Sequence, residues 1–429
     1  MSAGARVGRP APARLVAVYL SAALLCWVGA AIAVVRAAPE LASAGVAAPD
    51  VLFAVHLVGL AFLPLAVTGA ALHVLPTLLR NDASHARGWL ALPLLGAGPL
   101  LAYAIAYDHE TTTWIAACVE TAGFLLVAWE LVALVVRAPH DRMLLASRSG
   151  VLLSTFHAAA ALAVGAGLAD RGFRPLLGIP HDRAIGIHLN LAVLGWLTLL
   201  IVTVGRTLTP MLSLAPAAAR RRFPVEELVL TGGLWLIVAG LALGERAPAI
   251  VGGLLVLGTI AAFALLTARI GRRHRLEGIE GPLTHMVTGM FFLLQAAILG
   301  IGMLVGLDAS PARLTAYVVA LLVGWAAGVT LGHLGKLLSL SAWTWWPPGP
   351  RPKQAALYPR RVWLVEAVVF AVGIELLVNG VLARSESMTL LSGMLLVGAA
   401  GAACAGAALT LRAAQPALGH SARAPQTAR

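Results

Sequence analysis

The sequence predicts an all-α polytopic membrane protein with about twelve transmembrane helices, from its composition and the length of its apolar runs. Of its 429 residues, 59% are hydrophobic and only 12% are charged, and the mean hydropathy is +0.87. A soluble domain keeps about a quarter of its residues charged. The runs are about 20 residues long, which suits a helix and is about twice the length of a barrel strand. We expect a single membrane domain.

Twelve segments are long and apolar enough to cross a bilayer. Their expected limits are 14–36, 50–79, 88–107, 112–136, 148–169, 184–213, 226–244, 247–268, 282–307, 312–341, 361–382 and 387–411. They form three units of four, at about 14–137, 147–269 and 282–412. The first run has no signal-peptide cleavage pattern and reads as a span. The Ala/Pro/Arg-rich residues 413–429 are expected to form a disordered tail.

The formal net charge of +12 comes from arginines in the predicted loops. Loops on one side carry roughly three times as many basic residues as loops on the other, as the positive-inside rule describes. Both termini are therefore expected in the cytoplasm. The charge indicates a lipid bilayer as the partner, with no nucleic acid, and the expected location is the plasma membrane of a bacterium.

Three of the segments look like loose copies of one another, at 54–80, 186–210 and 316–343. Each carries polar or ionisable side chains at two depths. The outer level holds His56, His188 and Tyr317. The inner level lies 16 to 19 positions further along these copies, about 25 Å deeper at 1.5 Å per residue, and holds His73, Arg206, His333 and Lys336, with His285 on a neighbouring span.

The outer histidines are the first candidate site. A neutral imidazole tolerates the bilayer interior better than a carboxylate, and histidine is a common axial ligand of haem iron. A haem with two histidine ligands requires two histidines at one depth, on helices that face a shared space. The alternative is that His56 and His188 only hydrogen-bond to neighbouring helices. Position alone does not separate these two hypotheses.

The inner level and the carboxylates within the spans have a structural interpretation and a functional one. His73, His285 and His333 are read as structural groups or an inner polar cluster, and Met286 beside His285 as packing rather than a copper ligand. Glu120, Glu130, Glu366 and Glu375 are either counter-ions, for example of Arg206 and Lys336, or proton-relay groups. The structural interpretation is preferred for both sets.

The chain resembles the haem-bearing subunit I of the heme–copper oxidase and nitric-oxide-reductase superfamily, and especially its short twelve-span relatives. The resemblance rests on HLVGLAFL…GAALHVLPTLL (56–79), IHLNLAVLGWLTLL…TLTP (187–210) and LLVGWAAGVTLGHLGKLL (321–338). With the plan of three four-helix units, it extends over nearly the whole chain. It implies that His56 takes the place of a low-spin haem ligand and His188 that of a copper-site histidine.

This sequence departs from the family pattern at the oxygen-reducing centre. The family's seventh span supplies a His-His pair, but 231–244 contains no histidine. Its tenth span supplies two haem ligands, where this chain has Tyr317 at the outer level and His333 too deep to replace them. The resemblance therefore implies no copper and no ordinary oxygen or nitric oxide reduction, so whether the chain is an enzyme stays open.

Two functions from different classes follow. The first is a membrane protein that binds haem b through His56 and His188, either for electron transfer with respiratory subunits or a redox partner, or for diatomic-gas handling. The second is a transporter on the same scaffold, in which Arg206, Lys336 and the inner histidines bind an anion or a metal.

Overall fold

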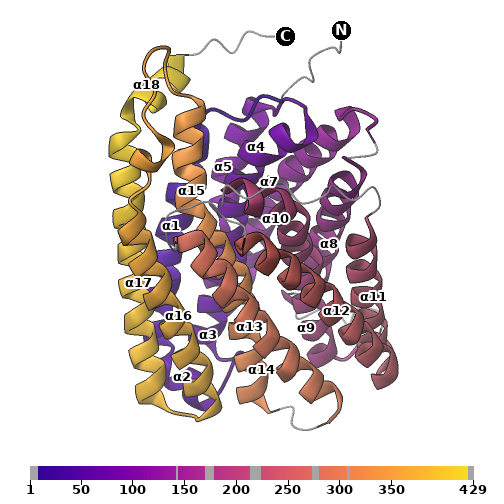
Figure 1. The fold of residues 1–429 in the computed structure, drawn as a ribbon. Helices are drawn as coiled ribbons and strands as arrows, with labels where there is room; N and C mark the ends of the chain where they lie inside the picture. Colours follow the sequence, from indigo (N-terminus) through magenta and orange to yellow (C-terminus); the bar gives the residue numbers. More distant parts are fainter. Residues whose placement is uncertain are drawn as a thin grey trace.

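The computed structural model describes residues 8–141, 144–169, 178–212, 224–272, 280–306 and 310–423. Within these ranges the chain is helical, and twelve helices are long and apolar enough to cross a membrane (Figure 1). We number them as spans 1 to 12 in chain order. Their limits agree with the sequence prediction to within a few residues, so the predicted fold class is confirmed.

Most spans are single α-helices, whereas span 3 is broken after Pro93 into α5 and α6. The bounds of these helices are α1 (Ala13–Arg36), α5 (His85–Leu95), α6 (Gly98–Ala106), α7 (Glu110–Arg137), α8 (Leu145–Ala169), α11 (Val225–Leu243), α12 (Arg246–Gly271), α13 (Gly281–Leu304), α16 (Arg360–Leu382) and α17 (Glu386–Ala413). Short elements outside the spans are α2 (Ala38–Ser43), the 3₁₀ turn η6 (Gln354–Leu357) and α18 (Gln415–Arg423).

Spans 2, 6 and 10 each contain a π-helical segment between two α-helices. Span 2 consists of α3 (Pro49–His56), η1 (Leu57–Phe62) and α4 (Leu63–Leu79); span 6 of α9 (His181–Asn190), η4 (Leu191–Thr198) and α10 (Leu199–Leu212); and span 10 of α14 (Pro311–Val318), η5 (Val319–Ala327) and α15 (Gly328–Thr344). A π-helical turn is rare and often lies at a functional site. Its recurrence in the second helix of each expected unit indicates a common plan.

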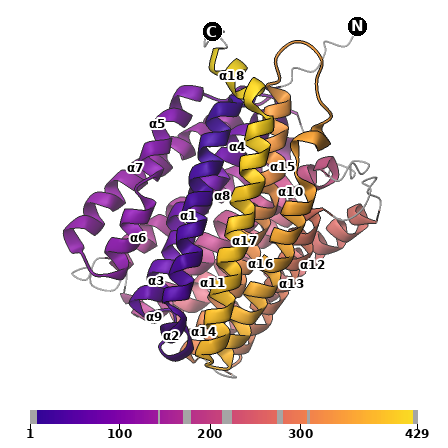
Figure 2. The ribbon, with the colours of Figure 1, turned by 90° about the vertical axis from the view of Figure 1, so that its left-hand side faces the viewer.

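The same three spans form the centre of the bundle. Their most apolar windows are 61%, 67% and 83% buried for spans 2, 6 and 10, against at most 50% for the other described spans. Trp325 in η5 donates its indole N–H to Thr198 Oγ1 at 2.8 Å, joining spans 10 and 6 where both side chains are fully buried. Outer spans then enclose this trio, and α1 packs beside α17, so the first and last spans meet (Figure 2).

Helix α18 packs against α1, at the end of the bundle where the first span begins. We call this end of the bundle, which the sequence predicts to be cytoplasmic, the inner end. The prediction of a disordered tail from residue 413 is wrong for Gln415–Arg423, which are helical. Ala414 and Ala417 are buried against Ala342 and Leu357, and this packing stabilises a helix that composition alone did not indicate. Residues 424–429 lie outside the described residues.

Candidate functional site

The outer cavity is a space lined by spans 2, 4, 5, 6 and 10, with the loop residue Val46 at its edge, and both His56 and His188 line it. About 890 Å³ around these residues is free of protein atoms, a figure that includes the open mouth. The rest of its lining is apolar or aromatic, with Leu60, Phe124, Leu162, Trp196 and Leu322 among the larger side chains. The structure thus brings the two predicted histidines to one apolar cavity.

Both imidazoles are oriented by backbone carbonyls. His56 Nδ1 lies 2.9 Å from Leu52 O, one turn earlier in α3. His188 Nδ1 lies 2.9 Å from Ala161 O, on the adjacent span 5. A carbonyl only accepts, so each ring carries its proton on Nδ1 and its Nε2 has a free lone pair. This is the tautomer of most metal-bound histidines, in which the second ring nitrogen is fixed by a hydrogen bond.

The π-helical segments lie next to these side chains. His56 is the last residue of α3, directly before η1, and His188 lies three residues before η4. The two rings are close enough to interact electrostatically. Phe124 of α7 packs edge-on against Trp196 of η4, with ring centroids 5.6 Å apart, and fixes the inner wall of the cavity.

Gly165 on span 5 leaves the room that the His188 ring occupies. A Cβ at this position would lie 2.8 Å from His188 Cε1, closer than van der Waals contact allows. We expect Gly165→Ala to rotate or displace the ring, to destabilise the fold by about 1–3 kcal/mol as overpacking does, and to weaken any ligand held by His188. Thermal stability and ligand absorbance of the purified variant measure both effects.

Gly258 on span 8 supplies the matched control for that substitution, because a Cβ there meets nothing within 4 Å. Gly258→Ala is expected to behave like the wild type. Equal behaviour of the two alanine variants would contradict the tight packing of His188.

Tyr317, the third predicted outer-level residue, does not line the outer cavity. Its hydroxyl donates to Asn190 Oδ1 at 3.2 Å, across the contact between spans 10 and 6, and its ring packs near Gly300. Tyr317 therefore joins the second and third units by a structural contact and does not belong to the wall of the outer cavity.

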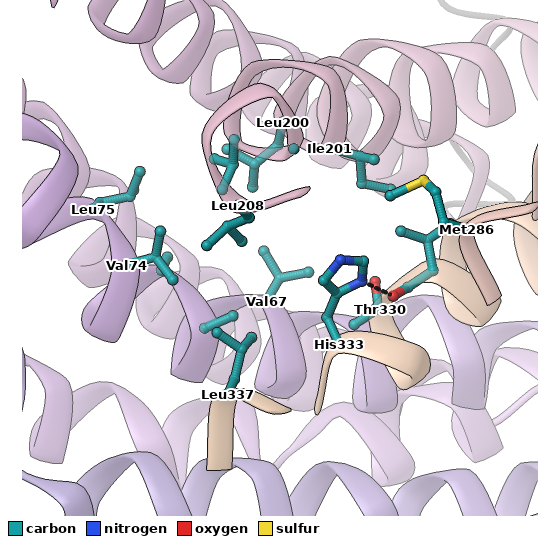
Figure 3. A pocket seen from close by; sticks show the side chains of 15 residues that line it. Val67, Val74, Leu75, Leu200, Ile201, Leu208, Met286, Thr330, His333 and Leu337 are labelled. Carbon is teal, nitrogen blue, oxygen red and sulfur yellow. Dashed lines mark hydrogen bonds between the residues drawn. The ribbon is translucent and has the colours of Figure 1, made fainter. Parts of the chain in front are cut away.

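The inner cavity is a second apolar space, of about 640 Å³ including its mouth, between the inner halves of spans 2, 6 and 10. Figure 3 shows His333 at its wall among Val67, Leu208 and Met286. His333 Nδ1 lies 2.8 Å from Val329 O, as for the outer histidines. Met286, which the sequence analysis read as packing, lines the cavity together with His333.

The other two inner histidines are buried away from this cavity wall. His285 Nε2 lies 2.8 Å from Glu366 Oε2, and both side chains are fully buried between spans 9 and 11. His73 on α4 is 5% exposed. Among the described residues, no group of three or more His, Cys, Asp or Glu side chains is arranged to hold a metal ion.

The inner cations both have carboxylate partners. Arg206 lies 2.6 Å from Glu226 and 3.5 Å from Glu227, at the start of span 7. Lys336 Nζ lies 2.7 Å from Glu280 Oε2 and 4.5 Å from the Tyr358 ring centroid. Burial, followed by the nearby glutamates, raises the pKa of the Tyr358 phenol in the adjacent loop.

These counter-ions differ from the carboxylates that the sequence analysis considered. Glu366 partners His285, Glu130 forms an ion pair with Arg87, and Glu375 accepts from Asn379. The glutamates that pair with Arg206 and Lys336 are not among the four predicted candidates. They lie beside the first turns of spans 7 and 9. The feature of the sequence that could have identified these counter-ions is an acidic residue at the boundary of a span, next to a basic loop.

Comparisons with known proteins agree on the fold alone. No family model matches the sequence, and no curated protein matches it. Among solved structures, the chain is similar to a cryo-EM structure of a heme–copper terminal oxidase dimer, with a TM-score of 0.53 and 12% sequence identity. The match covers 96% of this chain and 85% of that one. At 12% identity, this likeness shows that the chain shares its fold with that oxidase.

Proposed function

We propose that this chain binds one haem b in the outer cavity through His56 and His188, for electron transfer or for handling a diatomic gas. One observation carries the proposal: two imidazoles from different spans line one apolar cavity, each with its Nδ1 bound to a backbone carbonyl, which leaves Nε2 as the nitrogen available to a metal. The likeness to a heme–copper terminal oxidase fold supports it.

The residues of the cavity fit such a group. A bound haem supplies one-electron chemistry at its iron. His56 and His188 would hold the iron through Nε2, and the carbonyls of Leu52 and Ala161 increase the basicity of both ligands by accepting their Nδ1 protons. The aliphatic and aromatic lining excludes water from the macrocycle. Among the described residues no Arg or Lys lines this cavity, so the lining itself would supply no cation for the acidic groups of a haem.

Oxygen reduction is not part of the proposal, because the family positions for the copper ligands and the second haem ligand hold other residues. Transport is not favoured either. It rested on Arg206, Lys336 and the inner histidines binding an anion or a metal, and both Arg206 and Lys336 form ion pairs with glutamates of this chain. The proposed location is a bacterial plasma membrane, where a respiratory subunit or another redox partner exchanges electrons with the cavity.

The test is an optical spectrum of the purified protein, oxidised and dithionite-reduced, with haem extraction and assays for iron and copper. We expect one haem b per chain, no copper, and a low-spin reduced spectrum. Adding carbon monoxide separates the two uses: an unchanged reduced spectrum indicates electron transfer, whereas a shift indicates an open coordination position for gas. Colourless protein from cells supplied with haem would refute the proposal.

A further inference from the structure

Glu120 lies in the middle of α7 and is 1% exposed. Neither carboxylate oxygen has a hydrogen-bond partner among the described residues. An isolated charge in such surroundings costs far more than a neutral carboxyl group. Glu120 is therefore protonated when no positive charge is near it.

Glu120 lies one helical turn from a residue that lines the outer cavity. Phe124, one helical turn along α7 on the same face, lines that cavity, and residues four apart on a helix have Cβ atoms about 5–6 Å apart. Glu120 also lies at about the same depth along the bundle as His56, because span 4 begins at Glu110 and span 2 begins at Pro49. Both spans begin at the end of the bundle opposite α18.

The surroundings contain little else that titrates. On α1, Cys26 is near enough to be affected by the Glu120 charge. The other helices packed against α7 carry few titratable or charged groups. On α5, Arg87 pairs with Glu130 and His85 lies near the same glutamate. On α6, Tyr103 stacks on His109, and on α8, His157 packs against Trp235. Arg148 on α8 and the buried His73 on α4 lie toward the inner end. No basic side chain on these helices neutralises Glu120 in place of a proton.

We propose that Glu120 takes up a proton when the outer cavity gains an electron and releases it when the electron leaves. This inference rests on the proposed haem. A ferric centre would carry one more positive charge than a ferrous one, and in a medium of low dielectric constant that charge favours the carboxylate. A haem held there would supply the one-electron chemistry, with the electron coming from a redox partner; the Glu120 carboxylate would bind one proton from water for each electron gained, so charge in the apolar region would be conserved.

The first experiment measures the midpoint potential of the purified, haem-loaded protein as a function of pH. With one proton taken up per electron, the potential falls by up to about 59 mV for each tenfold fall in proton concentration. We expect that slope in the wild type and its loss in Glu120→Gln. Glu375→Gln is the matched control, because Glu375 lies in span 11 and already accepts from Asn379 at 2.8 Å. It should keep the wild-type slope.

A second readout does not depend on how the variant folds. The infrared difference spectrum of the wild type between oxidised and reduced states should show a protonated-carboxyl C=O band in the reduced state that shifts in D₂O. Haem with a pH-independent potential, no such band, or a slope unchanged in Glu120→Gln would each overturn this inference and leave the proposed function intact. Absence of haem would overturn both.

Discussion

Replacing either outer histidine is expected to abolish the low-spin spectrum of the haem-loaded protein. His56→Ala and His188→Ala each remove one of the two imidazoles that line the outer cavity, and a haem held by the single remaining imidazole would be high-spin and open to carbon monoxide. The double variant should lose nearly all bound haem. Absorbance per chain, measured on detergent-purified protein before and after reduction, gives the result.

His333→Ala is the matched control for that series. Its Nδ1 faces a backbone carbonyl in the same way, at 2.8 Å, but the ring lines the inner cavity. We expect this variant to keep its haem. The reverse pattern, with haem retained in the double variant and lost in His333→Ala, would move the site to the inner cavity.

The span plan was predictable from sequence because the bilayer fixes both the length and the composition of each helix. The π-helical segments were not. Residues Leu57–Phe62 read LVGLAF and are as apolar as their neighbours. Their helical geometry depends on how spans 2, 6 and 10 pack together, and hydropathy does not record that packing.

The depth of the site residues in the membrane was predictable from the sequence, but the direction in which each side chain points was not. Helical rise places His56 and His188 near one level, whereas the face each presents depends on neighbouring spans. The hydrogen bond from His188 to Ala161 joins residues 27 positions apart, and the space for the ring depends on Gly165. In the sequence, Glu120 is one of four carboxylates within the spans that cannot be told apart. Only the structure shows that Glu130 and Glu366 are paired and that Glu120 has no partner among the described residues.

The ion pairs at the inner end predict the second large effect. Arg206 lies between Glu226 and Glu227, and its side chain is 16% exposed. Arg206→Met removes the cation that pairs with both carboxylates, and breaking a buried ion pair by removing one partner costs about 3–5 kcal/mol. We expect the purified variant to lose its monodisperse size-exclusion peak at a clearly lower temperature than the wild type.

Removing all three charges should reverse most of that loss, because well-packed neutral groups of similar size often replace a buried ion pair without penalty. The triple variant Arg206→Met, Glu226→Gln, Glu227→Gln is therefore expected to be more stable than Arg206→Met alone. Arg269→Met, at an exposed position on the inner end of span 8, controls for the loss of an arginine as such. If Arg206→Met proved as stable as the wild type, Arg206 would not be held in place by its ion pairs, and the argument against an anion-transport role would fail.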